Sequence, residues 1–397
     1  MKKYIIHNNR LIWRDVEAQK TVKYITSYDE IPPHYQVVVN DENIPFLTSE
    51  GKLITIPIHL KIKDVFPCAS PFKINTHTFA INEWDEMWDW TGRNIPTKGV
   101  FNEYNFCQIS LSLAYAGIDK DNVPWGWGVR RYAGINQNIN GWTMTPVKIY
   151  GNHKFKYITG RAGIDENNKG WTWGRQGIIS SINLIGVLGN NVECSQELTP
   201  VQIYGNHNWK KISTGLNSTT ALDLNGKAWA WGGNNGGVLG DGTTTRRITP
   251  VEVYGNHSFV DIDGGMGLTD DGKLWCWGGM TGDGTNTART TPVEVYGNHT
   301  FCSIARGHFR AAIDNHGIGW SWGTNMYGQL GDGGPVLEHH STLTPTKIYG
   351  NHTFCKIKGY SYNCKGIDIN GRLWSWGRGP GTGGLISYTC TPVAVCI

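Results

Sequence analysis

The segment Trp275-Cys276-Trp277-Gly278 contains a Trp-x-Trp pair that recurs seven times along the chain and decides the fold. Successive pairs are separated by 37, 46, 58, 46, 45 and 54 residues, and together they use fourteen of the eighteen tryptophans. The pairs are Trp88/Trp90, Trp125/Trp127, Trp171/Trp173, Trp229/Trp231, Trp275/Trp277, Trp320/Trp322 and Trp374/Trp376. A period in this range is typical of repeat arrays, so we expect seven equivalent structural units.

Each unit is predicted to contain four short antiparallel strands. The first starts with Thr-Pro and alternates apolar residues, as in residues 249–254. The second carries an aromatic residue and an isoleucine three positions apart, such as Phe259 and Ile262. The third ends near a hairpin turn such as residues 270–272, and the Trp-x-Trp-Gly strand closes the unit.

Units of roughly 47 residues with these strands and periodic glycine and aromatic motifs predict an all-β fold, a seven-bladed β-propeller of four-stranded antiparallel blades spanning residues 67–397. Residues 391–397 have the pattern of a first strand with no unit after it, and the unit at residues 77–90 lacks such a strand. We therefore expect the C-terminal strand to close the ring by joining that blade. At least ten of the fourteen paired tryptophans are expected to be largely buried between blades.

Residues 1–66 carry no repeat phrase and are predicted to form a small β-rich N-terminal extension. Strand-like runs occur at residues 3–6, 36–39 and 53–58. This segment suits a docking arm, and the alternative is a degenerate extra blade.

Composition excludes several classes of function. The net charge of +4 has no associated run of basic residues, so no specific nucleic-acid partner is expected. The chain has no signal peptide and no apolar run long enough to span a membrane, which predicts synthesis in a cytosol without general secretion. The nine cysteines form no Cys-x-x-Cys motif and are expected to be reduced.

No arrangement of residues predicts catalysis, a cofactor or a metal. Nucleophile-elbow and phosphate-binding motifs are missing from the sequence. Tyr-Gly-Asn-His phrases place five histidines in equivalent turns, at His153, His207, His257, His299 and His352. One ligand per unit does not converge on a metal ion, so a repeated turn structure explains these histidines better. We therefore expect a protein that is not an enzyme.

The loops after the Trp-x-Trp-Gly strands hold many of the arginines and should cluster on one rim of the ring. Variable loops on a rigid scaffold are common binding sites, and arginine and aromatic residues are enriched in interface hot spots. The alternative is that these loops are simply solvated. The candidate binding residues are Arg130, Arg131, Tyr132, Trp142, Arg246, Arg247 and Tyr327.

A glycine-rich phrase occurs at residues 328–333, with variants at 237–242 and 282–284. This phrase and the Thr-Pro-Val and Trp-x-Trp-Gly strands together resemble the regulator of chromosome condensation repeat. This resemblance covers about five-sixths of the chain and implies a seven-bladed propeller. The family includes a guanine nucleotide exchange factor for a small GTPase. Arg310, Ser218 and Asn363 lie near the position where its third strand commonly carries a histidine, and we assign no exchange residue.

We expect a non-enzymatic interaction propeller that binds protein partners. The favoured hypothesis is a virus or phage structural component located in the virion, such as a tail, fibre or capsid-surface protein, with other structural subunits or a host surface receptor as partners. The alternative is a cytoplasmic regulator that resembles an exchange factor for a small GTPase. A surface adhesin exported by another route is a third hypothesis.

Overall fold

The structure is a computed structural model that describes only strands within residues 2–98 and most of residues 104–394. In the latter part it describes residues 104–111, 114–137, 141–175, 186–193, 196–215, 217–334, 341–378 and 388–394. The chain divides into two compact units, residues 1–61 with residue 397, and residues 62–396. The boundary that we expected between residues 66 and 67 falls inside β6 (Ile62–Pro67), a strand of the second unit.

The described part of the first unit consists of β-strands. A three-stranded antiparallel sheet and a two-stranded one are present. Two of the three predicted strand-like runs coincide with strands of these sheets, and the third, residues 36–39, lies outside the described residues. The strands are β1 (Lys2–His7), β2 (Arg10–Asp15) and β3 (Lys20–Ile25), then β4 (Asn43–Leu47) and β5 (Leu53–Pro57).

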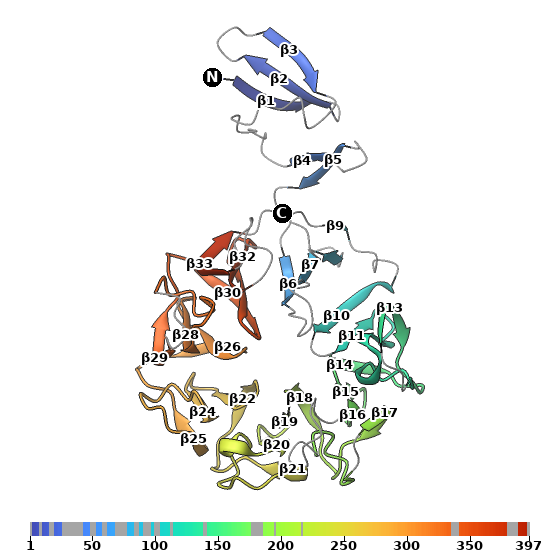
Figure 1. Cartoon of the computed structure of the whole chain (residues 1–397), viewed down its shortest axis with the longest axis vertical. Coiled ribbons are helices and arrows are strands. Elements are labelled where there is room, and N and C mark those ends of the chain that lie inside the picture. Colours follow the sequence, from blue (N-terminus) through green and yellow to red (C-terminus); the bar gives the residue numbers. More distant parts are fainter. Residues whose placement is uncertain are drawn as a thin grey trace. The chain divides into compact units, whose positions relative to one another are not determined.

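The second unit consists of four-stranded antiparallel sheets arranged in a ring (Figure 1), which is the architecture of a β-propeller. In each sheet, strands that follow one another in sequence pair with one another. The predicted all-β class and the four-stranded antiparallel blades are therefore confirmed.

Six of these sheets lie between residues 104 and 394. The first three contain β10 (Phe106–Leu111), β11 (Ala114–Asp119), β12 (Pro124–Val129) and β13 (Trp142–Lys148); β14 (Phe155–Thr159), β15 (Ala162–Asp165), β16 (Gly170–Arg175) and β17 (Gln196–Gln202); and β18 (Trp209–Thr214), β19 (Ser218–Asp223), β20 (Ala228–Gly232) and β21 (Arg247–Glu252). The other three contain β22 (Phe259–Ile262), β23 (Met266–Thr269), β24 (Leu274–Gly278) and β25 (Arg289–Glu294); β26 (Phe301–Arg306), β27 (Phe309–Asp314), β28 (Gly319–Thr324) and β29 (Ser341–Lys347); and β30 (Phe354–Tyr360), β31 (Asn363–Asp368), β32 (Leu373–Arg378) and β33 (Tyr388–Ala394). Two short 3-10 helices, η3 (Arg130–Tyr132) and η5 (Asn235–Gly237), follow β12 and β20.

A further four-stranded sheet precedes these six, and its first two strands pair with the same register shift as theirs. It contains β6, β7 (Thr78–Asn82), β8 (Met87–Asp89) and β9 (Thr97–Lys98). The pairing of β6 with β7 shifts between Ile62 and Asp64, as the pairing of β22 with β23 shifts between Phe259 and Asp261. The sequence did not reveal β6 because Ile62 stands where the other repeats carry an aromatic residue.

The predicted closure of the ring by residues 391–397 is wrong. Each Thr-Pro strand pairs with the Trp-x-Trp strand that precedes it in sequence, as β25 does with β24. It is therefore the last strand of one blade and does not begin the next blade. The C-terminal strand β33 likewise pairs with β32, and it takes no part in the sheet of β8. Residues 395–397 lie outside the described residues.

The physical reason lies in the connections between strands. The longer loop after each Trp-x-Trp-Gly strand returns the chain along the same sheet, whereas the Tyr-Gly-Asn-His turn carries it to the next sheet. In that turn Gly297 has a φ of 104°, and a Cβ added there would lie 2.7 Å from His299 Nε2. Only glycine accepts this conformation and this close approach readily. The sequence period is the same whichever strand is counted first, so it left the order of strands within a blade undetermined.

In the pairs that the structure describes, the second tryptophan packs between neighbouring sheets. Trp231 from β20 lies in one buried cluster with Ala162 and Ile164 from β15 in the preceding sheet. All six second tryptophans in the described sheets have 0% exposure, namely Trp127, Trp173, Trp231, Trp277, Trp322 and Trp376. Each such ring buries roughly 150–250 Å² and therefore contributes strongly to the association of the sheets.

The first tryptophans are only half-buried. Trp320, for example, packs against a buried cluster at one edge while its Nε1 donates a hydrogen bond of 2.9 Å to Asp314 Oδ2. Six of the twelve paired tryptophans described are fully buried and the other six are partly buried, so full burial is limited to the second position of each pair. Side chains of Trp88 and Trp90 lie outside the described residues.

A repeated glycine lets each loop approach the second tryptophan of the next sheet. Gly331 has a φ of 67°, and a Cβ added there would lie 2.6 Å from Trp376 Cδ1. Gln329 O in the same loop accepts a hydrogen bond of 3.1 Å from Trp376 Nε1. The equivalent glycines that contact a second tryptophan are Gly134, Gly189, Gly240 and Gly282. The glycine-rich phrase is therefore a packing element between blades.

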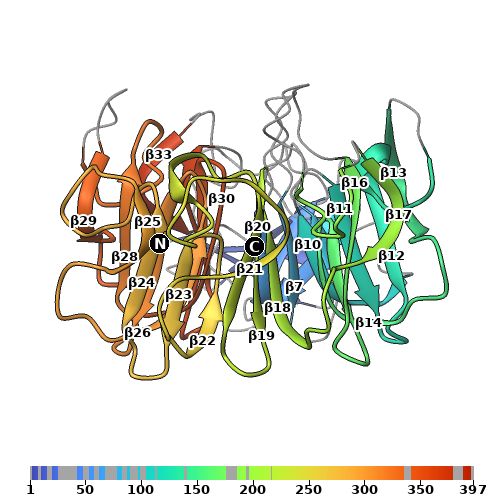
Figure 2. The ribbon, with the colours of Figure 1, turned by 90° about the horizontal axis from the view of Figure 1, so that it is seen from below.

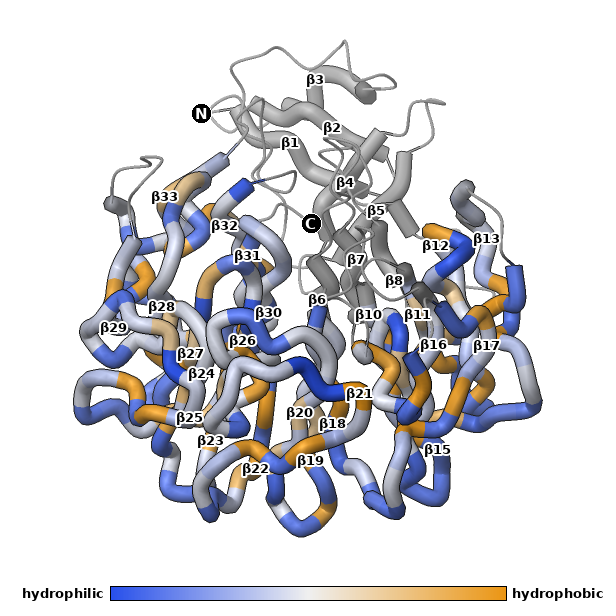
Figure 3. Tube along the Cα trace, turned by 60° about the horizontal axis from the view of Figure 1, so that its bottom comes forward, coloured by the Kyte–Doolittle hydropathy of each residue, from blue (hydrophilic) through white to orange (hydrophobic). Residues whose placement is uncertain are grey.

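The strands run between two faces of the ring (Figure 2). One, the loop face, carries the loops from first to second and from third to fourth strands, such as residues 215–217 and 233–246. The other, the turn face, carries the hairpins from second to third strands and the Tyr-Gly-Asn-His turns. Figure 3 shows that hydrophobic stretches follow the strands and that the connections are largely hydrophilic.

Candidate functional site on the loop face

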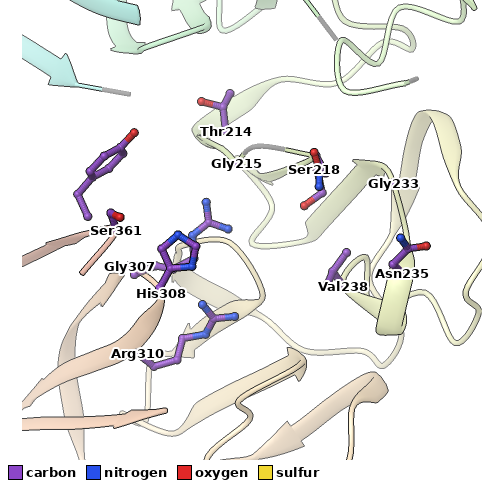
Figure 4. Close-up of a pocket in the computed structure, with 13 residues that line it drawn as sticks. Thr214, Gly215, Ser218, Gly233, Asn235, Val238, Gly307, His308, Arg310 and Ser361 are labelled. Carbon is purple, nitrogen blue, oxygen red and sulfur yellow. The ribbon is translucent and has the colours of Figure 1, made fainter. Parts of the chain in front are cut away.

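A pocket of about 330 Å³ lies on the loop face, between the ends of strands from different sheets (Figure 4). One side is formed by the sheet of β18–β21 and the other by the β26–β27 hairpin and the end of β30. The lining residues are Thr214, Gly215, Asn217, Ser218, Gly233, Asn235, Val238, Arg306, Gly307, His308, Arg310, Tyr360 and Ser361. This lining includes two arginines and a histidine but no carboxylate.

The turn between β22 and β23 makes room for Arg306. Gly264 and Gly265 have φ values of 49° and 59°, and a Cβ added to Gly264 would collide with the Arg306 guanidinium. The missing side chains let Arg306 extend from β26 across this sheet, so that its Nη2 lies 3.0 Å from the position of a Cβ on Gly215. Two glycines in sequence thus position a cation in the pocket.

Arg310 is the most buried charged residue of the pocket. Its side chain projects from β27 (Figure 4), the residue is 8% exposed, and its Nε has no hydrogen-bond partner among the described residues. Burial lowers the pKa of Arg310 to about 10, and the charge of Arg306 contributes to the decrease. The guanidinium therefore stays protonated at neutral pH.

One acidic group, Asp263, acts on Arg310 electrostatically without forming an ion pair with it. The Oδ1 of Asp263 accepts a hydrogen bond of 2.7 Å from Ser213 Oγ. Within the described part of the chain, no carboxylate forms an ion pair with Arg306 or Arg310. The pocket therefore has uncompensated positive charge.

A series of aromatic and cationic side chains extends outward from the pocket. The His308 ring stacks on Tyr362 at 4.6 Å between centroids and 12° between planes. Tyr327 contacts Tyr362 edge-on at 5.0 Å, and the Arg378 guanidinium lies 4.7 Å from the Tyr327 ring centroid. These four residues, His308, Tyr362, Tyr327 and Arg378, are called the aromatic series below.

Three of the predicted binding residues lie in η3, and Trp142 lies beside them. Trp142 pairs with Val129, the residue before η3, and is 39% exposed. Tyr132 is only 8% exposed, because it packs with Ala133 and Ile135. Arg130 and Arg131 are half-buried in the same helix. These residues therefore lie together, with Tyr132 in the core, and their role in binding stays a prediction.

Arg246 and Arg247, immediately before and at the start of β21, are both engaged by carboxylates, one from the loop of the preceding sheet and one from their own loop. Arg246 Nη2 lies 2.6 Å from Glu193 Oε1, and Arg247 Nε donates a hydrogen bond of 2.8 Å to Asp241 Oδ2. Burial alone would raise the pKa of Asp241, but hydrogen bonds from Thr243 and Arg247 lower it below its usual value. These arginines therefore stabilise the loops and offer less free charge than Arg306 and Arg310.

Sequence reasoning missed the pocket although part of its signal was visible. Tyr327 was a candidate and belongs to the aromatic series. Arg310 and Ser218 were noted only because they lie near a histidine position of the related repeats, and both line the pocket. The proximity of Arg306 to Gly215 depends on the packing of successive sheets and has no local sequence signal.

The turn face carries the repeated histidines, which pack against tryptophans. His352 lies 3.9 Å from Trp374 between ring centroids, and the corresponding distance from His299 to Trp320 is 4.0 Å. Burial lowers the pKa of both histidines. Over the described residues, no group of three or more His, Cys, Asp or Glu side chains could hold a metal ion.

Comparison with known proteins identifies similar repeat propellers. The RCC1 domain-containing protein RUG3, mitochondrial, of Arabidopsis thaliana is 26% identical over 318 residues, which are 72% of this chain and 69% of RUG3. Yeast RCC1 (Prp20) bound to Kap60 has a TM-score of 0.67 at 19% identity, over 85% of this chain and 86% of Prp20. Another structure of Prp20p, from Saccharomyces cerevisiae, gives a TM-score of 0.67 and 19% identity over 85% and 88% of the two chains. No protein-family model matches.

These similarities support the fold and the resemblance to RCC1 repeats. RUG3 and Prp20 are named as RCC1-type proteins, and neither name describes a virion component. The expected virus or phage structural role therefore receives no support from them. Within the described part of the chain, no helix is both long enough and apolar enough to cross a membrane.

Proposed function

Because the chain is a β-propeller of RCC1-like repeats, we propose that it is a non-enzymatic regulator that binds a protein partner, a small GTPase, on its loop face. Prp20p has been studied for its binding properties to Gsp1p and histones, which supports a protein-binding role for a propeller of this kind. The proposal includes seven blades, with the sheet of β6–β9 as the first. It places the protein in the cytoplasm, and residues 1–61 act as a docking arm.

The aromatic series is the observation that carries the proposal. Tyr327 and Tyr362 are half-buried, and Arg378 is exposed beside them. Such rings add contact area with little loss of side-chain entropy, and arginine pairs with acidic groups in two-pronged geometry. The neighbouring pocket adds positive charge from Arg306 and Arg310. The loop face therefore suits a partner with an acidic surface.

The test is binding and nucleotide release with purified small GTPases encoded in the same genome. Association would be measured by biolayer interferometry with nucleotide-free and GDP-bound GTPase, and release of a fluorescent GDP analogue would be followed by stopped flow. We expect one GTPase to bind most tightly in its nucleotide-free form and to release GDP faster when the propeller is present.

Variants locate the contact. Tyr327→Ala and Arg378→Ala should each weaken binding by about tenfold or more, which is the effect of losing a hot-spot residue. Tyr296→Ala is the matched control, because Tyr296 is a tyrosine of the turn face with 64% exposure. Equal losses in the two tyrosine variants, or no binding to any GTPase, would refute the proposal.

A further inference from the structure

We propose that the pocket on the loop face is a binding site for the oxyanion group, a phosphate or a carboxylate, of a small ligand. This inference goes beyond the proposed function, because it requires no protein partner. It rests on the burial and geometry of Arg306 and Arg310 and on the composition of the pocket lining.

The first argument is an uncompensated buried cation. Arg310 is only 8% exposed, and its Nε donor has no hydrogen-bond partner among the described residues. A buried donor without an acceptor is costly, and a buried charge more so, unless an opposite charge binds there. An oxyanion in the pocket would supply both the missing acceptor and the missing charge.

The second argument is that the chain places two guanidinium groups on one small space. Arg306 crosses the Gly264–Gly265 turn, and Arg310 Nη2 lies 3.4 Å from the position of a Cβ on Gly265. Like charges held close together repel each other, and the Arg306 charge contributes to the lowered pKa of Arg310. Two arginine forks that face one cavity provide the geometry that phosphate and carboxylate groups prefer.

The third argument concerns size and the remaining lining. The pocket volume of about 330 Å³ is at the lower end of the range for small-ligand sites. This volume is larger than a single oxyanion group, so a small group attached to the oxyanion would also fit. Neutral hydrogen-bonding residues, including Ser218, Asn235 and Ser361, line the rest of the cavity. Since no carboxylate lines it, no negatively charged side chain in the pocket wall opposes an anion.

The experiment measures binding of inorganic phosphate and of malonate to the full chain by isothermal titration calorimetry, with ionic strength held constant by chloride. We expect saturable binding with a stoichiometry of one. Tighter binding of phosphate would assign a phosphate-bearing ligand, and tighter binding of malonate a carboxylate-bearing one. No saturable binding of either anion would overturn the proposal.

Three variants separate a built site from surface attraction. Arg306→Met and Arg310→Met should each weaken binding by about tenfold or more, because each removes charge-assisted hydrogen bonds. Arg372→Met is the control, since it removes an arginine from the turn face and should leave binding unchanged. Arg306 is half-buried, so its variant remains informative if Arg310→Met fails to fold. Equal binding by wild type and both pocket variants would show an adventitious ion only and would overturn the proposal.

Discussion

Replacing Asp314 by alanine should destabilise the propeller by about 3 kcal/mol. Asp314 is 6% exposed, and its Oδ1 accepts hydrogen bonds of 2.9 Å from the backbone N–H groups of His316 and Ile318. Its Oδ2 accepts a third, of 2.9 Å, from Trp320 Nε1. Hydrogen bonds to a charged group contribute about 1.5–3 kcal/mol each, but the exposed turn lets water replace part of this, so the total is nearer the cost of one or two bonds.

The chain contains its own control for this substitution. In the sheet of β22–β25 the equivalent position is Thr269, whose Oγ1 contacts Asp271 Oδ1 at 2.6 Å on the exposed side of the turn. Thr269→Ala should therefore cost less than about 1 kcal/mol. Urea unfolding followed by tryptophan fluorescence and circular dichroism would compare both variants with wild type. Equal shifts of the two midpoints would refute the role that we assign to the aspartate.

Three further predictions concern packing, pH and the loops. Gly331→Ala should destabilise the fold by at least about 2 kcal/mol more than Gly284→Ala, because both have positive φ but only the former would place a Cβ against Trp376; equal thermal midpoints would contradict this. Stability should fall as pH decreases from about 7 through 6.5, because burial lowers the folded-state pKa of His299 and His352 and the unfolded chain then binds protons first; a midpoint that is constant between pH 7.5 and 5.5 would argue against it. Asp241→Asn should increase hydrogen exchange in residues 233–246 with little effect elsewhere, because it weakens the contact with Arg247; unchanged exchange in that loop would disprove the assignment.

The blade structure could be predicted from the sequence because each repeat encodes it locally. Trp-x-Trp strands, hairpin turns and the Tyr-Gly-Asn-His turns each specify a short piece of backbone, and the period repeats it. The phase of the repeat could not be predicted in this way. A Thr-Pro strand could pair with the Trp-x-Trp strand before it or with the strand after it, depending on the path of the loop that precedes it. The pairing of β33 with β32 shows that it joins the strand before it.

The candidate site was predictable only in part. Tyr327 was found because its loop position and residue type are typical of interfaces. Arg246 and Arg247 were chosen on the same two criteria, yet Glu193 and Asp241 engage them. The pocket escaped prediction because Arg306 and Gly215 are ninety-one positions apart in sequence, and only the packing of three successive sheets brings them together.

The central claim, that the loop face is the functional surface, is tested most directly by hydrogen–deuterium exchange of the chain with and without its bound GTPase. Protection on complex formation should concentrate at the strand ends of the pocket, in residues 306–308 and 360–362, and around Tyr327. Protection confined to the Tyr-Gly-Asn-His turns, or to residues 1–61, would contradict the claim.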